Sequence, residues 1–298
     1  MPRILLTGKT GQVGWELARA LAPLGELIAP GRGEMDLADP DSIRSAIRQA
    51  RPEIIVNAAA FASVDEVEAQ PELAMQVNGV APGILAEEAK RIGALLVHYS
   101  SAYVFDGRST RPYVEEDPPN PINVYGKTKL AGERAIAACG GAHLILRMSW
   151  IYSLRGVNFL TTFLKLAREK KELPVVNDQI GNPTWARAVA EATATLLGSG
   201  DVRDRAGLYH LSASGSVSRF TFAERILAIA RELLRMNTNT TLKPVTTADY
   251  PLPAARPLNC ATSKQKIGRA FGIEMPRWDA QLRSSLAQLA GERKHHDA

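Results

Sequence analysis

A tyrosine and a lysine that are four residues apart, Tyr125 and Lys129, lie in the stretch NVYGKTKLAGE. The stretch is typical of the first turns of a helix, which would place both side chains on one face. A phenol in water titrates near pH ~10, and an ammonium one helical turn away favours the phenolate and lowers that pKa. Such a tyrosine can donate a proton to a carbonyl oxygen while hydride arrives at the carbon.

A serine that precedes this helix is a candidate third member of the set. Ser101 lies at the end of an apolar run, in HYSSAYVFDG. Its hydroxyl can bond the same carbonyl oxygen as Tyr125. The alternative is a strand-end hydroxyl that caps the backbone.

Three glycines follow the first apolar run, in TGKTGQVG: Gly8, Gly11 and Gly14. Glycines let the backbone turn tightly and approach a pyrophosphate, which then lies on the N-terminus of the next helix. The spacing differs by one residue from the usual G-x-G-x-x-G fingerprint. Its place between a strand and a helix predicts a dinucleotide site, and a simple packing turn is the alternative.

The choice of nicotinamide cofactor depends on the end of the second strand, in IAPGRGEMDL. An acid there would hold a free ribose 2′-hydroxyl, but Arg32 comes first, and Glu34 and Asp36 follow it. Because an arginine can bind a 2′-phosphate through two hydrogen bonds, the sequence favours NADPH, with NADH possible. An exposed loop arginine is the alternative.

The elements that must position these residues alternate between apolar strands and helices. Strands that are apolar throughout and separated by helices predict a parallel sheet covered on both faces, doubly wound and Rossmann-like, with ligands at the strand carboxyl ends. After Trp150 the alternation is less regular. We therefore expect a dinucleotide-binding domain at 1–150 and a smaller α/β domain at 151–298, mainly substrate-binding, with GLYHL returning to the main sheet. The expected segments are strands at 3–7, 53–60, 94–101 and 143–150, and helices at 12–22, 39–50, 158–170, 186–197 and 220–234.

Composition excludes several classes of protein. The 298 residues are 45% hydrophobic and 22% charged, as in ordinary globular proteins, and no apolar run reaches the ~18–20 residues of a membrane span. The net charge is +5, but the densest basic stretch, Lys165–Glu172, mixes acids with bases, so no nucleic-acid partner is expected. Cys139 and Cys260 fit no metal or redox spacing, which favours the cytoplasm.

At these residues the sequence resembles the extended short-chain dehydrogenase/reductase superfamily, and within it the dTDP-4-dehydrorhamnose reductase family. The resemblance covers nearly the whole chain, including LLTGKTGQVGWELARAL, RPEIIVNAAAFASVDEVE, VHYSSAYVFDG, NVYGKTKLAGE, LRMSWIY, NDQIGNPT, GLYHL and RPLN. It implies reduction of the C4 ketone of a dTDP-keto-sugar, dTDP-4-dehydro-L-rhamnose, by NAD(P)H, and a possible homodimer. Two alternatives are an NAD(P)-binding nucleotide-sugar epimerase or dehydratase, and a non-catalytic regulatory subunit on the same fold.

The resemblance also implies roles for matching positions. Tyr125 would be the proton donor, Lys129 would lower its pKa and hold the nicotinamide ribose, and Ser101 would polarise the ketone. Besides these residues and the glycines and Arg32 above, the implied cofactor contacts are Gln12, Val13, Asp36, Leu37, Ala58, Ala59, Ala60 and Asn78. The implied substrate contacts are Ser101, Ala102, Trp150, Asn177, Gln179 and Arg256.

The chain departs from the family at one position, and one ligand follows from the resemblance alone. The family commonly has S-T-D-Y-V-F where this chain has SSAYVF, so Ala102 lacks a carboxylate that would contact the sugar. Some members hold Mg²⁺ near the subunit contact, and Glu16, Glu191 and Glu292 are the glutamates that match by position. Solvated surface glutamates are the alternative.

Overall fold

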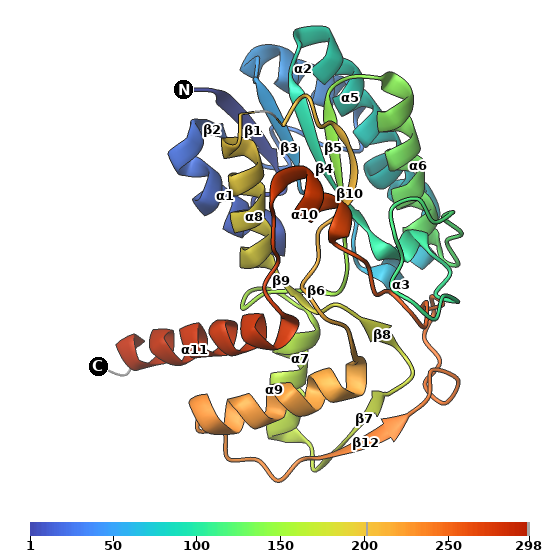
Figure 1. The fold of residues 1–298 in the computed structure, drawn as a ribbon, viewed down its shortest axis with the longest axis vertical. Helices are drawn as coiled ribbons and strands as arrows, with labels where there is room; N and C mark the ends of the chain where they lie inside the picture. The colour runs from blue at the N-terminus through green and yellow to red at the C-terminus, as the bar shows by residue number, and fades with distance from the viewer. Residues whose placement is uncertain (201, 297–298) are drawn as a thin grey trace.

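The computed structural model describes residues 1–200 and 202–296, with residues 293–296 described by their backbone alone. Its centre is a six-stranded sheet in which every pair of neighbours is parallel (Figure 1). The order is β10-β5-β4-β3-β1-β2. The strands are β1 (Arg3–Thr7), β2 (Glu26–Ile28), β3 (Ile54–Asn57), β4 (Leu95–Ser101), β5 (His143–Met148) and β10 (Gly207–His210).

The strand order confirms the doubly wound fold. From β1 the chain moves outward to β2 at one edge and then returns to β3 on the other side of β1. The loops after β1 and β3 therefore diverge at their carboxyl ends, where a doubly wound sheet binds its ligand.

Helices cover both faces of the sheet (Figure 1). One face carries α1 (Gln12–Leu21) and α8 (Ala186–Gly198), which pack against each other. The other carries α2 (Pro40–Ala50), α5 (Ala81–Ile92) and α6 (Val124–Cys139). The apolar residues of each helix are spaced so that they lie on the side that is buried. Leu17 and Leu21 of α1 belong to one apolar cluster, and Ile43 and Ile47 of α2 belong to the other.

The remaining elements form a smaller layer beyond the carboxyl ends of the strands (Figure 1). The helices expected at 158–170, 186–197 and 220–234 are α7, α8 and α9. The helices of this layer are α7 (Phe159–Glu169), α9 (Arg219–Leu233) and α11 (Trp278–His296). Its strands form three pairs: β7 (Glu172–Val176) with β12 (Thr241–Val245), β6 (Ile151–Tyr152) with β9 (Thr184–Trp185), and β8 (Ile180–Gly181) with β11 (Val217–Ser218).

Short helical segments complete the chain. Three 3₁₀ or π segments are η1 (Ala22–Leu24), η2 (Gln76–Val80) and η3 (Ala102–Val104), and three short α-helices are α3 (Val64–Ala69), α4 (Pro71–Met75) and α10 (Gln265–Phe271). The π-helical turn η2 continues into α5. Such turns often mark functional sites, and this one carries Asn78.

One apolar cluster runs through both layers. It extends from Leu17 under the sheet to Phe222 on α9 and Leu286 on α11. Moreover, β10 and α8 belong to the sheet layer, although both come after residue 150 in the chain. The division at residue 150 therefore stays a prediction. No helix in the described ranges has both the length and the apolar character that crossing a membrane requires.

Candidate active site

The helix that carries Tyr125 starts from a fixed position. Asn123 caps α6 by accepting a hydrogen bond from the Gly126 amide at 2.8 Å, and the Val124 amide donates to the Glu68 carboxylate at 3.0 Å. A Cβ added to Gly126 would lie 2.1 Å from the Tyr103 carbonyl oxygen. Glycine is therefore required for the first turn of α6 to lie against the segment that follows β4.

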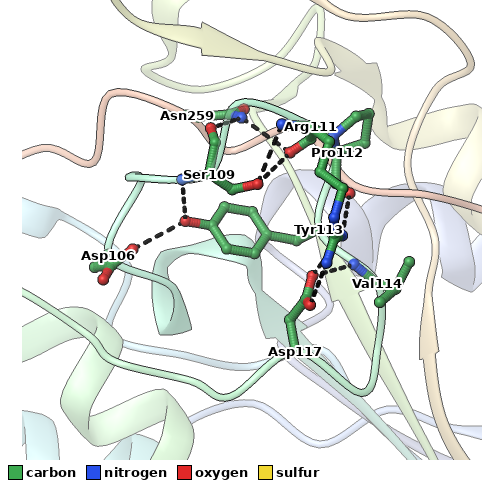
Figure 2. Close-up of polar contacts among 8 residues, drawn as sticks. All are labelled: Asp106, Ser109, Arg111, Pro112, Tyr113, Val114, Asp117 and Asn259. Carbon is green, nitrogen blue, oxygen red and sulfur yellow. Dashed lines mark hydrogen bonds and ion pairs between the residues drawn. The ribbon is translucent and has the colours of Figure 1, made fainter.

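The loop between β4 and α6 is held by its own polar contacts (Figure 2). The Tyr113 hydroxyl donates to Asp106 at 2.9 Å and accepts from the Ser109 amide at 3.1 Å. Arg111 pairs with Asp117 at 2.7 Å, and the Asn259 amide donates to the Ser109 carbonyl at 2.7 Å. These contacts join the loop to the C-terminal part of the chain and fix α6 relative to the end of β4.

Ser101 and Tyr125 line one cavity of about 320 Å³, together with Trp150. Burial raises the pKa of Tyr125, while hydrogen bonding with the Ser101 side chain lowers it. The phenol is therefore protonated at neutral pH and can donate. The structure thus brings two of the three predicted catalytic side chains together at the end of β4.

Lys129 is only 2% exposed and is not among the residues that line this cavity. Its Nζ donates to the Tyr99 carbonyl at 2.6 Å and lies 3.2 Å from His98 Nε2. Burial lowers the pKa of Lys129 to about 8, against the opposing effect of Glu133. On balance the pKa of the phenol is raised, and the lowering of that pKa by Lys129 stays a prediction.

The partner of Lys129 belongs to a row of buried polar side chains across three neighbouring strands. Thr7 of β1 is in register with Asn57 of β3, and Asn57 with His98 of β4. The Thr7 hydroxyl donates to Asn57 Oδ1 at 2.7 Å, and Asn57 Nδ2 lies 3.0 Å from His98 Nδ1. Burial, with the nearby charge of Lys129, holds the pKa of His98 well below its usual value. His98 is therefore neutral, so one of its ring nitrogens carries a proton and only the other can accept a hydrogen bond.

A second cavity, of about 500 Å³, lies at the carboxyl ends of β1 and β3. Gly8 has a φ of +74°, and a Cβ there would meet the Ala59 backbone nitrogen at 2.7 Å. A Cβ on Gly14 would lie 1.9 Å from the Gly8 carbonyl oxygen. Predicted cofactor residues that line this cavity are Gly8, Gly11, Arg32, Asp36, Leu37, Ala58, Ala59 and Ala60.

The residues around this second cavity fit a dinucleotide. Gly11, the residue before α1, provides no side-chain cap, which leaves the first amides of the helix free for a pyrophosphate. Gln12 lines the Tyr125 cavity, and its buried Oε1 has no hydrogen-bond partner among the described residues. Val13 and Gly14 are buried in α1 and pack the turn.

Two further predicted cofactor residues have identifiable contacts. Arg32 is largely exposed at the rim, with its Nε 3.8 Å from Asp36 Oδ1. This long contact leaves the guanidinium able to reach a phosphate. Asn78 is buried and does not line the cavity; it donates to and accepts from the Phe61 backbone at 2.9 Å in both cases, and its Nδ2 lies 3.3 Å from Thr128 Oγ1. Asn78 thus joins the segment after β3, which carries Phe61, to Thr128 on α6.

Trp150, like Ser101, is a predicted substrate residue that lines the Tyr125 cavity. Its φ of +44° lies in the left-handed region, which is an outlier for a bulky residue and occurs where structure is constrained for function. A Cβ on Gly181 would lie 2.4 Å from the Trp150 ring, so the indole packs directly on that glycine.

The other predicted substrate residues lie differently. Ala102 is fully buried and absent from the cavity lining, and Asn177 is exposed. Gln179 is buried, and it accepts from Arg219 Nε at 3.3 Å. Arg256 is paired with Asp65 at 2.8 Å. The roles of these residues in binding substrate remain predictions.

Two residues of the site were not anticipated from the sequence. Arg219 lines the Tyr125 cavity at the start of α9, and His98 contacts Lys129. For Arg219 the local signal is an arginine directly after a helix-capping serine, which is common at helix starts. His98 is one polar residue within an apolar strand. Both became visible as site residues only when distant segments were brought together.

The three predicted metal ligands do not form a site within one chain. Glu16 on α1 is paired with Arg187 at 3.2 Å, while Glu191 and Glu292 are exposed on α8 and α11. Over residues 1–200 and 202–296, no group of three or more His, Cys, Asp or Glu side chains can hold a metal ion. Mg²⁺ at a subunit contact stays a prediction.

The chain is similar to known proteins over nearly its whole length. Residues 2–290 match the family model of the RmlD substrate binding domain. A dTDP-4-dehydrorhamnose reductase of Burkholderia thailandensis is 44% identical over 284 residues, covering 93% of this chain and 95% of that protein. The Escherichia coli K12 enzyme of the same name is 43% identical over 294 residues, covering 96% and 97%.

A solved structure extends the likeness to three dimensions. The dTDP-4-dehydrorhamnose reductase of Bacillus anthracis, in complex with NADP, has a TM-score of 0.89 and 31% identity, covering 96% of this chain and 99% of that one. The family indicated by the sequence motifs is confirmed. The chain belongs to the family of the RmlD substrate binding domain, together with these dTDP-4-dehydrorhamnose reductases.

Proposed function

We propose that this protein reduces the C4 ketone of dTDP-4-dehydro-L-rhamnose to dTDP-L-rhamnose with hydride from NADPH. The observation that carries the proposal is the meeting of Ser101 and Tyr125 in one cavity, beside a glycine-lined cavity suited to a dinucleotide. Relatives that are 43–44% identical over almost the whole chain carry this activity in their names.

The side chains of the cavity supply the proton and the polarisation. When bound, NADPH supplies the hydride. The Ser101 hydroxyl donates a hydrogen bond to the ketone oxygen and draws electron density from the carbon. Tyr125, kept protonated by burial, transfers its phenolic proton to that oxygen as the alkoxide develops. The Trp150 ring forms a wall on which the sugar can pack.

The role of Lys129 is to stabilise the ionised form of Tyr125. Once Tyr125 has given up its proton, the Lys129 ammonium, which comes from the same helix, stabilises the phenolate. His98 contacts the Lys129 amino group, and Asn57 contacts the other ring nitrogen of His98. For the cofactor, Arg32 at the rim favours the 2′-phosphate of NADPH.

A stoichiometric assay tests the proposed function. Purified protein is given dTDP-4-dehydro-L-rhamnose with NADPH or NADH, and loss of reduced cofactor is compared with product formed. We expect one NADPH consumed for each dTDP-L-rhamnose, and a higher kcat/KM with NADPH. An epimerase or dehydratase would regenerate its cofactor, so turnover without net NADPH loss would overturn the proposal.

A further inference from the structure

Arg219 is the first residue of α9, and its side chain lines the cavity that holds Ser101 and Tyr125. Its guanidinium carbon lies 4.1 Å from the centroid of the Trp150 ring and 4.9 Å from that of Phe159. Planar cations stack on aromatic rings in this way, and the contact orients the guanidinium. Contacts with two aromatic rings therefore fix the position of the Arg219 guanidinium.

Gln179 fixes the arginine from a second direction. The Arg219 backbone amide donates to the Gln179 carbonyl at 2.9 Å, and Arg219 Nε donates to Gln179 Oε1 at 3.3 Å. Gln179 is itself held by Thr247, which accepts from its Nε2 at 3.1 Å. The side-chain amide of Gln179 therefore contacts Arg219 through its oxygen and Thr247 through its nitrogen.

The charge on Arg219 has no protein counterion in the described part of the chain, where no carboxylate lies within ion-pair distance of it. The nearby arginine, Arg256, is different because Asp65 neutralises it at 2.8 Å. Burial lowers the pKa of Arg219, but a guanidinium starts so high that it stays charged. A half-buried cation without an anion is costly unless a ligand completes it.

We propose that Arg219, stacked on Trp150 and held by Gln179, binds the diphosphate of the nucleotide-sugar substrate. This inference rests on the proposed function, since it names the part of that substrate which Arg219 recognises. Its two terminal amino groups match two phosphate oxygens, a geometry that lysine cannot reproduce. Arg219 would thereby favour sugars that carry a nucleoside diphosphate over neutral sugars.

A diphosphate is present in both substrate and cofactor, so the two sources must be separated. The cofactor is expected over the glycine loop, whereas Arg219 lies with Trp150 and Ser101 in the other cavity. The test therefore measures the affinity of NADPH alongside that of dTDP and thymidine, by calorimetry and without turnover. The variants are Arg219→Gln, Arg219→Lys and the control Arg225→Gln, which changes an exposed arginine on the same helix.

For Arg219→Gln we expect a loss of dTDP affinity of about 10- to 100-fold, with NADPH and thymidine affinities within about twofold of the parent chain. Arg219→Lys should recover part of the loss, and Arg225→Gln should change nothing. Unchanged dTDP affinity would overturn the inference, as would an equal loss for thymidine, and a selective loss of NADPH would assign Arg219 to the cofactor instead. Because binding is measured without reaction, failure of the proposed reduction would show separately, in the NADPH assay.

Discussion

At the scale of single residues, the chemistry rests on a half-buried phenol, a serine hydroxyl and a buried ammonium. The spacing of Tyr125 and Lys129, and the place of Ser101 at a strand end, were sufficient to nominate all three from the sequence. The contacts of Lys129 were not predictable, because His98 and the Tyr99 carbonyl reach it from a strand some thirty residues earlier. Nor could the sequence show that Asp65 neutralises Arg256, while Arg219 has no carboxylate partner among the described residues.

The buried ammonium of Lys129 should make both activity and stability depend on pH. Its pKa in the folded protein is about 8, below its ordinary value of 10.5. Between these values the unfolded chain binds a proton that the folded chain does not, so stability rises with pH through this window. Below pH 8 the full cost of burying the charge, roughly 2–4 kcal/mol, is present.

We therefore expect Lys129→Met to lose most turnover while its Tm at pH 7 equals or exceeds that of the parent chain. Its advantage in Tm should shrink as pH rises from 8 to 10, and turnover of the parent chain should decline above about pH 8. Thermal unfolding at several pH values and a kcat profile check this. Lys127→Met, which changes an exposed lysine on the same helix, is the control; a Tm for Lys129→Met well below the parent's at pH 7 would contradict the assignment.

At the scale of elements, the sequence predicted the sheet well because its strands are short, apolar and bounded by clear turns. The strand expected at 3–7 matches β1, and the helices expected at 12–22 and 39–50 differ from α1 and α2 by one residue. The short strand pairs β6 with β9 and β8 with β11 were not predicted. Two-residue strands have no periodicity of their own, and only tertiary pairing defines them.

The row formed by Thr7, Asn57 and His98 shows how register places function. Each member lies opposite the next on a neighbouring strand, and the row ends at Lys129. We expect His98→Phe to remove the imidazole ring that contacts both Asn57 Nδ2 and Lys129 Nζ. The free energy of unfolding should fall by about 1–3 kcal/mol.

A purely structural role for His98 would lower stability without moving the pH profile. We expect instead that His98→Phe shifts the alkaline limb of kcat, because the Lys129 amino group has lost its contact with the ring. His98→Gln, which can still form a hydrogen bond through its side-chain amide, should restore part of the shift. His143→Phe changes a half-buried histidine on β5 and is the control. A pH profile of His98→Phe identical to that of the parent chain would show that His98 does not act on Lys129.

At the scale of the whole molecule, the two layers share one core. Arg155 stacks on Trp15 of α1 with its guanidinium carbon 3.8 Å from the ring centroid, and one apolar cluster extends from Leu17 of α1 to Leu286 of α11. The division expected at residue 150 followed a change in sequence pattern, whereas contact between layers depends on β10 and α8 returning to the sheet. A one-dimensional pattern does not carry that information.

We therefore expect the full chain to unfold in a single transition and a fragment of residues 1–150 not to fold alone. The fragment would lack β10, which leaves β5 as an open edge, and α8, which leaves the apolar face of α1 uncovered. Circular dichroism and denaturant titration of both chains measure this. A fragment that unfolds cooperatively and binds NADPH would establish an independent domain at residues 1–150.

The central claim is that hydride reaches the C4 carbon of the sugar while Tyr125 gives its proton to the oxygen. The most direct measurement uses NADPH that carries deuterium at its transferable position and follows the label into the product by mass spectrometry, for the parent chain and for Tyr125→Phe. The account predicts one deuterium at C4 of dTDP-L-rhamnose, and a rate for Tyr125→Phe lower by about 10²-fold or more at unchanged NADPH affinity. A product without deuterium, or a Tyr125→Phe rate close to that of the parent chain, would contradict it.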